Sequence, residues 1–228
     1  MTHDLFNRSD EYDTMLAQGI ALSGEGKEYF IAGRIEDLRR HLPREFRPRQ
    51  ILDFGCGTGT ATAYLAEAFP EADVVGVDTA EAALGRAEQL YGSKRVHFRP
   101  VDALGQPESF QLCYVNGVFH HVEPARRDGA ARMIHSALGA GGFCALFENN
   151  PWNFGARLVM KRIPFDRDAI PLAAPEARRL LRRAGFDVSR PTRFLFYFPH
   201  VLAWLRRIEP SLAALPLGAQ YYLLAARV

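Results

Sequence analysis

The sequence has few of the features that mark membrane or secreted proteins. No stretch approaches the ~20 consecutive apolar residues that a membrane-spanning helix needs. The best candidate, residues 194–205, is shorter and contains Pro199 and His200. The first 13 residues carry four acidic side chains and no apolar core, unlike a secretory signal peptide. We therefore expect a cytoplasmic protein with no stable membrane insertion.

The sequence also has few cysteines and almost no net charge. The three cysteines are odd in number and lack the spacing of metal ligands, so we interpret them as reduced, mostly buried thiols. The net charge is only +2, and the isoelectric point of 8.5 lies below the value of about 9 that marks a basic nucleic-acid-binding domain. The arginine pairs fall on expected helices whose other face is apolar, which is typical of a solvated surface. We expect no zinc site and no nucleic-acid partner.

The sequence does contain a regular alternation of strand-length apolar runs and helical stretches. With 228 residues, 48% of them hydrophobic, the chain is long enough to bury a core of its own. Strands that alternate with helices of this length predict an α/β fold with a doubly wound, mostly parallel sheet. The expected strands are residues 50–54, 72–78, 95–99, 110–115 and 142–147, and the helices between them are 60–69, 80–90 and 126–138.

The two ends of the chain depart from this alternation. A helical segment precedes the first strand, and residues 151–172 have no clean period, which indicates a loop. Beyond it, Pro175 and Gly185 bound a further helix at its start and end. The elements expected here are helices at 27–41 and 175–184, strands at 186–198 and 220–228, and short helical pieces at 200–208 and 211–215.

A glycine-rich loop joins the first expected strand to the first helix after it. Gly55, Gly57 and Gly59 permit a tight turn and let a ligand approach the backbone, and the helix that follows offers free N–H groups. The pattern G-x-G-x-G has Thr60 where a dinucleotide fingerprint would have its third glycine. No G-K-[ST] follows, so the loop is not a phosphate-binding loop of that type. The loop therefore indicates another class of cofactor.

Three further motifs follow expected strands. Asp78 ends the second strand, where a carboxylate can accept hydrogen bonds from both hydroxyls of a ribose. Asp102 and Ala103 follow the third strand, where an acid and a small residue suit the amine of a base. Residues 116–122, which include a histidine pair, end the fourth strand. Ligands of open α/β sheets bind at this edge, so these motifs belong to one expected site.

These four motifs, in this order and on these elements, resemble the class I S-adenosylmethionine-dependent methyltransferases of the bacterial small-molecule type. The resemblance implies a Rossmann-like, seven-stranded, mostly parallel sheet with an antiparallel last strand, a helical N-terminal lid and a small helical insertion before the last strand. It implies one domain over residues 1–228. Its parts are lid helices at 1–48, a cofactor-binding core at 49–149, a substrate cap loop at 150–174, and a C-terminal part at 175–228 with a helix, late strands and the insertion.

The resemblance also assigns roles to the motif residues. Gly55, Gly57 and Gly59 would line the methionyl part of S-adenosylmethionine, and Asp53 would help position its amino group. The remaining implied contacts are Asp78 with the ribose hydroxyls, Asp102 with the adenine amine, Ala103 with the adenine ring, the Asn116 backbone with the amino group, and Val118 with the cofactor.

The lid segment offers further residues that could contact the cofactor, and the strand ends offer candidate catalytic bases. Tyr29, Phe30 and Arg34 resemble the aromatic and basic lid side chains that close over the cofactor, with Arg34 pairing the methionyl carboxylate. The alternative is that Tyr29 and Phe30 belong to the helix core and that Arg34 is a solvated charge. His121 and Glu148 are the candidates for a catalytic base, with His120 a weaker one. The alternative is that these side chains only position the loop or the substrate.

The interpretation that follows is a transferase that moves a methyl group from S-adenosylmethionine to an oxygen or nitrogen of a small molecule by in-line displacement, leaving S-adenosylhomocysteine. No metal is expected, because no carboxylate cluster stands out beyond the cofactor acids. A homodimer is left open. Two alternatives come from other classes: a regulatory protein that binds the cofactor without chemistry, and a nicotinamide-dependent oxidoreductase, which the missing third glycine disfavours.

Overall fold

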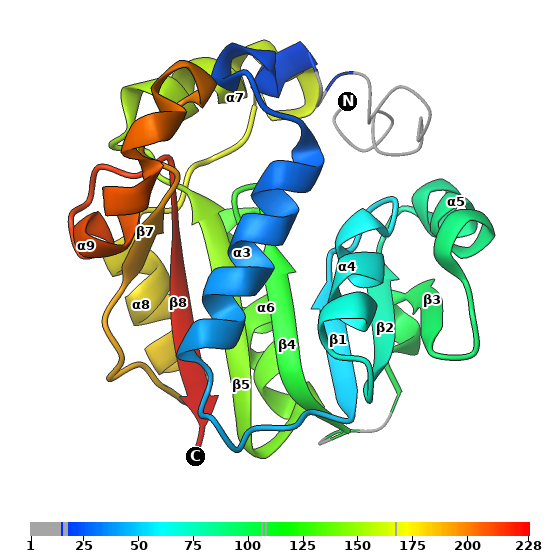
Figure 1. Cartoon of the computed structure of the whole chain (residues 1–228). Helices are drawn as coiled ribbons and strands as arrows, with labels where there is room; N and C mark the ends of the chain where they lie inside the picture. Colours follow the sequence, from blue (N-terminus) through cyan, green and yellow to red (C-terminus); the bar gives the residue numbers. More distant parts are fainter. Residues whose placement is uncertain (1–14, 16–17, 106, 108, 167) are drawn as a thin grey trace.

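The structure is a computed structural model that describes residue 15 and residues 18–228, apart from residues 106, 108 and 167 (Figure 1). Its centre is a sheet with the strand order β3-β2-β1-β4-β5-β8-β6, in which β7 also pairs with β8. Strands β1 to β5 run parallel, and β8 is antiparallel to β5. The strands are β1 (Gln50–Phe54), β2 (Asp73–Asp78), β3 (Val96–Pro100), β4 (Phe110–Asn116), β5 (Leu138–Asn149), β6 (Phe186–Asp187), β7 (Arg193–Leu195) and β8 (Gln220–Arg227).

Helices cover both faces of the sheet, as the alternation of elements predicts (Figure 1). Adjacent residues of a strand point to opposite faces. On one face Ile51 packs with Leu38 of α3 and Leu65 of α4, and on the other Leu52 packs with Ile134 of α6. The helices are α3 (Lys27–His41), α4 (Thr60–Ala68), α5 (Glu81–Tyr91), α6 (Pro124–Ala137), α7 (Phe154–Arg162), α8 (Ala174–Arg183) and α9 (Glu209–Leu212), with short 3₁₀ turns at η1 (Ala21–Ser23), η2 (Val101–Ala103), η3 (Pro164–Asp166) and η4 (His200–Ile208).

The doubly wound sheet with an antiparallel last strand is confirmed, with one difference at its edge. The expected single strand at 186–198 is two short strands, β6 and β7, which pair with different parts of β8. Asp187 accepts a hydrogen bond from the backbone N–H of Ser189, which closes a turn directly after β6, and Pro191 has no N–H to offer a ladder. Eight strands therefore fill seven positions.

The cap segment differs more from its expectation. Residues 154–162 form helix α7 rather than loop. Asn153 caps this helix, because its side-chain oxygen accepts a hydrogen bond from the N–H of Ala156. The helical insertion before the last strand is present as η4 and α9. The acidic segment of the first 13 residues lies outside the described part of the chain.

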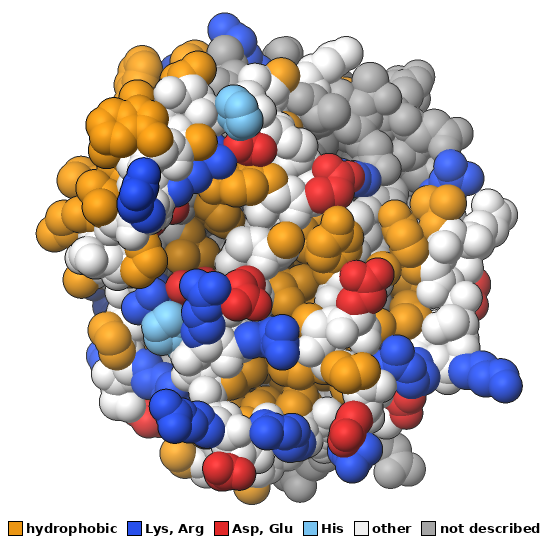
Figure 2. Space-filling view, in the orientation of Figure 1, with side chains coloured by type: hydrophobic (Ala, Val, Ile, Leu, Met, Phe, Trp, Pro, Cys, Tyr) orange, Lys and Arg blue, Asp and Glu red, His pale blue; other side chains and the backbone are white. Residues whose placement is uncertain are grey.

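Three further features of the structure concern membrane spans, surface charge and cysteines. Within the described residues, no helix is both long and apolar enough to cross a membrane. On the face shown in Figure 2, Lys and Arg side chains are interspersed with Asp and Glu and do not gather into one basic patch. Cys56, Cys113 and Cys144 are free and buried, and burial raises the pKa of the Cys56 and Cys113 thiols, so they stay protonated.

Candidate active site

A pocket opens where the carboxyl ends of β1 and β4 meet the first turns of α3. Parallel strands place the loops that follow them at one edge of the sheet, so motifs far apart in the sequence meet there. Val159 of helix α7 and Gln220 at the start of β8 also line the pocket, so the sheet, the lid helix and the cap segment meet there. Its lining includes Lys27, Phe30, Ile31, Arg34, Asp53, Gly55, Cys56, Gly57, Thr58, Tyr114, Asn116, Gly117, His120, His121, Asn149, Val159, Ile163, Asp166 and Gln220.

The three loop glycines all have positive φ, but for different purposes. Gly57 lines the pocket, and a Cβ added there would meet nothing within 4 Å, so the backbone stands open to a ligand. A Cβ on Gly55 would lie 2.3 Å from Cγ2 of Val118, so this glycine lets two loops pack together. A Cβ on Gly59 would lie 2.7–2.8 Å from Phe98 and Ala87, outside the pocket. Gly57 therefore leaves backbone exposed to a ligand, whereas Gly55 and Gly59 allow close packing against neighbouring side chains.

Replacing Gly55 with alanine is expected to destabilise the fold by about 2 kcal/mol or more, because the new methyl group overlaps Val118 and φ is +77°. Gly129 is the matched control. It lies exposed in α6 with open space around it, so Gly129→Ala should stabilise by about 0.4–1 kcal/mol. Urea-induced unfolding followed by circular dichroism measures both. Equal changes in the two variants would contradict the packing role of Gly55.

Asp53 is the buried acid of the pocket. Its side chain is 2% exposed and accepts a hydrogen bond of 2.7 Å from the Thr62 hydroxyl. Burial raises the pKa of Asp53 to about 7; the charge of Asp78 adds to this effect, while Thr62 and Arg34 oppose it. A carboxyl group that titrates near neutrality in a pocket is suited to a cationic ligand.

Asp78, at the end of β2, lies behind the loop and does not line the described pocket. One of its oxygens accepts a hydrogen bond of 2.8 Å from the N–H of Gly57, and the other accepts one of 3.0 Å from the N–H of Ala80. The carboxylate thus fixes the loop while keeping lone pairs for a ligand. Asp102 and Ala103 lie exposed in η2, and they too are outside the pocket lining.

The lid helix α3 brings Arg34, but not Tyr29, into the pocket. Arg34 is only 5% exposed; its Nε donates to the Tyr114 hydroxyl and its Nη1 to Oε1 of Gln220, both at 2.9 Å. The alternative of a solvated charge is therefore wrong for Arg34. Tyr29 instead packs against Phe30 and Phe196, with the Arg206 guanidinium 4.5 Å from the centre of its ring. Phe30 is the aromatic residue of α3 that lines the pocket.

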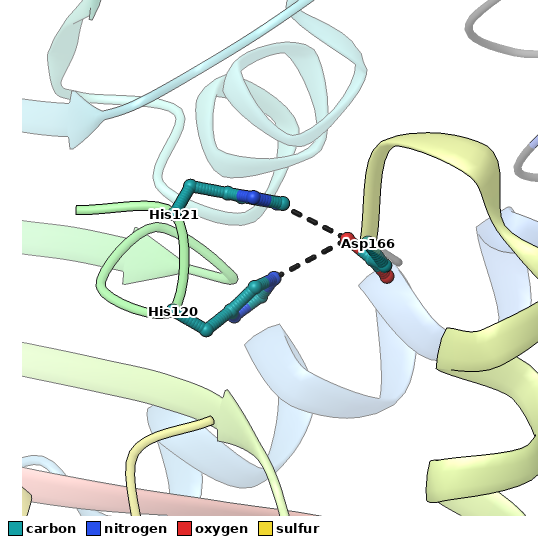
Figure 3. Close-up of side chains that lie close together, drawn as sticks. All are labelled: His120, His121 and Asp166. Atoms are coloured by element: carbon teal, nitrogen blue, oxygen red, sulfur yellow. Dashed lines mark ion pairs between the residues drawn. The ribbon is translucent and has the colours of Figure 1, made fainter. Parts of the chain in front are cut away.

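The two histidines of the loop after β4 lie in a row of side chains with Glu148 of β5 and Asp166 of η3, and Asp166 is the member that the sequence did not reveal (Figure 3). Oδ1 of Asp166 lies 3.1 Å from Nε2 of His121 and 3.4 Å from Nε2 of His120. Nδ1 of His120 lies 2.5 Å from Oε2 of Glu148, whose Oε1 accepts a 2.7 Å hydrogen bond from the N–H of Phe119. Glu148 is 1% exposed and does not line the pocket. It holds His120 and the loop in place, whereas the two histidines and Asp166 face the pocket.

The electrostatics of this row of side chains follow from its carboxylates. Burial alone would lower the pKa of His120, but Glu148 and Asp166 outweigh it and raise the pKa to about 10. Burial likewise would raise the pKa of Asp166, and the two imidazoles hold it below its usual value. A histidine this basic carries a proton at neutral pH, which is not the form that a catalytic base needs. Of the pair, His121 is the one left for that role.

Comparisons with known proteins agree with this arrangement. A family model described as a methyltransferase domain matches residues 51–142, which hold the glycine loop and the motifs after β2 and β4. An uncharacterized methyltransferase from Synechocystis sp. is 32% identical over 147 residues, 62% of this chain and 68% of that protein. A trans-aconitate 2-methyltransferase from Rhodopseudomonas palustris is 29% identical over 170 residues, 69% of this chain. The chain spans 65% of the length of that relative, just under two thirds.

The fold has close structural counterparts too. A methyltransferase structure from Thermotoga maritima, described as a possible histamine N-methyltransferase, superposes with a TM-score of 0.69 at 16% identity and full coverage of both chains. At that identity the likeness shows the fold alone. The sequence relatives and the matched family model carry the assignment further: this chain belongs to the class I S-adenosylmethionine-dependent methyltransferase family.

Proposed function

We propose that the protein transfers a methyl group from S-adenosylmethionine to an oxygen or nitrogen atom of a small molecule. One observation carries the proposal: the open backbone of Gly57, the buried acid Asp53 and the buried cation Arg34 line a single pocket beside His121. Membership of the family implies S-adenosylmethionine as the cofactor. In the pocket, Asp53 could pair with its ammonium group and Arg34 with its carboxylate. The relatives whose names specify trans-aconitate support a small-molecule acceptor.

The residues present fit the methionyl part of the cofactor. Arg34 is a buried guanidinium that donates hydrogen bonds to a hydroxyl and to an amide oxygen, so a carboxylate would supply the anion that it lacks among the described residues. Asp53 and the Asn116 backbone would meet the ammonium group. Gly55 and Gly57 would let the chain between these ends approach the backbone. Asp78 would take the ribose hydroxyls, and Asp102 with Ala103 the adenine, beyond the described pocket.

The bound cofactor supplies a methyl group on a positively charged sulfur. The protein's task is to hold the acceptor in line with the carbon–sulfur bond and to exclude water, because alignment supplies most of the rate in such a displacement. Helices α3 and α7 flank the pocket on two sides and would shield it. His121 would accept the proton of an acceptor that starts protonated, and Glu148 would act through His120, not on substrate.

Calorimetric titration with S-adenosylmethionine, S-adenosylhomocysteine and NAD, each added to the native protein, tests the cofactor. We expect micromolar binding of the first two and none of NAD. Single-turnover assays with labelled methyl donor and a panel of small acids, alcohols and amines, trans-aconitate among them, then test the chemistry. Absence of sulfur-cofactor binding to folded protein would overturn the proposal. Cofactor binding without transfer to any acceptor, including those in a cell extract, would favour a regulatory role.

The affinity for S-adenosylmethionine should rise with pH up to about 7 and then level off. In the free protein burial raises the pKa of Asp53 to about 7, so the group is protonated below that pH. An ammonium beside it favours the ionised form, so binding releases a proton, and affinity falls up to about tenfold per unit below pH 7. Calorimetry in buffers of different ionisation enthalpy measures the released proton. Asp53→Asn should bind more weakly, with the pH dependence removed; a native profile that is flat below pH 7 would contradict this role.

A further inference from the structure

His120, His121 and Asp166 bring three potential metal-ligand atoms together at the wall of the pocket (Figure 3). One ring nitrogen of each histidine and a carboxylate oxygen of Asp166 all lie within 4.8 Å of one another. Two of the separations, from Oδ1 to the imidazole nitrogens, are 3.1 and 3.4 Å. Ligand atoms that sit about 2.0–2.1 Å from a shared tetrahedral ion lie about 3.3 Å from each other. The two carboxylate–imidazole separations thus match those of ligands around one ion.

The surroundings of the three side chains support a built site. Oδ1 of Asp166 is buried, and its two neighbours among the described residues are the imidazoles with which it pairs by charge, neither of them in good hydrogen-bond geometry. Nδ1 of His120 faces Oε2 of Glu148 at 2.5 Å, which directs Nε2 toward the pocket. A carboxylate behind a histidine is the usual support for a metal-bound imidazole. His120 is 4% and Asp166 7% exposed, so these ligands are held by packing rather than by solvent.

We propose that His120, His121 and Asp166 bind one divalent transition-metal ion of the zinc type, with an open coordination position toward the pocket. The ion takes the place of the proton that Nε2 of His120 carries in the metal-free protein, and that proton is released to solvent. Two imidazoles and one carboxylate suit zinc, iron, cobalt or nickel better than magnesium or calcium, which take mostly oxygen ligands. Three protein ligands leave a position for water or a ligand atom, as in catalytic zinc sites. The proposal departs from the sequence-based expectation that no metal is bound.

The consequence for the reaction rests on the proposed methyl transfer. An acceptor hydroxyl or carboxylate bound at the open position would be held beside the methyl group, and a hydroxyl would lose its proton to solvent more easily. Its oxygen then forms a bond to the methyl carbon while the carbon–sulfur bond breaks and its electron pair stays on sulfur. His121 is in this arrangement a ligand rather than a base. The site favours oxygen acceptors that chelate or coordinate over amines that arrive protonated.

The test is metal binding by the full chain, prepared without a histidine tag. After removal of metal with EDTA and dialysis against zinc, mass spectrometry should find one zinc per chain, and cobalt in its place should give visible ligand-field absorption. Asp166→Asn, which keeps the size but removes the charge, should lower zinc affinity at least 100-fold. Glu148→Gln should lower it about 10- to 100-fold through His120. Asp168→Asn, an exposed acid two residues along, is the matched control and should bind as the native protein does.

Two outcomes would overturn the site: a folded native protein that retains no zinc, or an Asp166→Asn variant that binds zinc as tightly as the native chain. Thermal melting of each variant without metal shows whether a loss reflects unfolding, and His121→Ala, a partly exposed ligand, serves as a second variant. Calorimetry with S-adenosylmethionine on the metal-free protein separates the two proposals. Cofactor binding without zinc binding refutes only the metal site, and zinc binding without cofactor binding refutes only the methyl transfer.

Discussion

Replacing Asp78 with alanine is expected to lower the affinity for S-adenosylmethionine by about 100-fold. The carboxylate holds the N–H of Gly57, which lines the pocket, and is the proposed acceptor for the ribose hydroxyls. A hydrogen bond to a charged group contributes about 1.5–3 kcal/mol, and each 1.4 kcal/mol is tenfold in affinity. Without the carboxylate the N–H of Gly57 loses its acceptor, which lets Gly57 move away from the pocket, and the N–H of Ala80 loses its acceptor as well. Calorimetric titration at neutral pH gives the dissociation constants.

Asp73 supplies the control at the opposite end of the same strand. Its carboxylate accepts a hydrogen bond from the side-chain amide of Gln50, far from the loop, and Asp73→Ala should bind the cofactor within about twofold of the native protein. Asp78→Asn keeps the size and one acceptor oxygen, and should lie between native and alanine. If Asp78→Ala binds as tightly as Asp73→Ala, the ribose contact is placed elsewhere.

The parts of the fold that could be predicted are those set by local sequence. β1 and β2 are short apolar runs that end at glycine or acid, and each signal lies within a few residues. The late strand at 186–198 was wrong in detail, because the turn after Asp187 depends on side-chain hydrogen bonding and on Pro191. Residues 151–172 lack a clean period and predict a loop where helix α7 lies, although Asn153 is a residue that commonly caps helices.

Some residues of the candidate site can likewise be predicted from local sequence, and others cannot. Lys27, Ile31 and Arg34 follow each other at helical spacing, so one face of α3 turns to the pocket, and Tyr29 lies off that face. That periodicity is readable in the sequence and could have excluded Tyr29. No local sequence signal connects Asp166 to the histidine pair. The two lie more than 40 residues apart in the sequence and meet only when the cap segment folds back to the edge of the sheet. Partners across such distances need the structure.

Glu148 lies at the predicted strand end, and its buried partners favour a positioning role over that of a base. A strand end faces the site, yet which way the carboxylate turns depends on the loop after β4. That loop presents the N–H of Phe119 and the Nδ1 of His120, and both oxygens of Glu148 are engaged with them. The side chain is therefore a buried partner of His120 and of the Phe119 N–H, which supports the proposal that it acts through His120.

Replacing Glu148 with alanine is expected to cost about 3–5 kcal/mol of stability, the range for breaking a buried charged pair by removing one partner. The Phe119 N–H would lose its acceptor inside the protein, and His120, 4% exposed, would lose the nearer of its two carboxylates. Glu148→Gln should cost less, because an amide oxygen can still accept from Phe119. Urea-induced unfolding of EDTA-treated protein measures the difference without any contribution from bound metal.

Glu123 is the matched control, since it is also a glutamate within reach of a basic side chain. Its partner Arg126 is 3.7 Å away, and both side chains are well over half exposed, so Glu123→Ala should change stability by less than about 0.5 kcal/mol. The contrast between the two glutamates isolates burial as the cause, because the charge removed is the same. A Glu148→Ala variant as stable as Glu123→Ala would mean that His120 finds another partner or sheds its proton. The chain from Glu148 through His120 to Asp166 would then not be what holds the loop after β4 at the pocket.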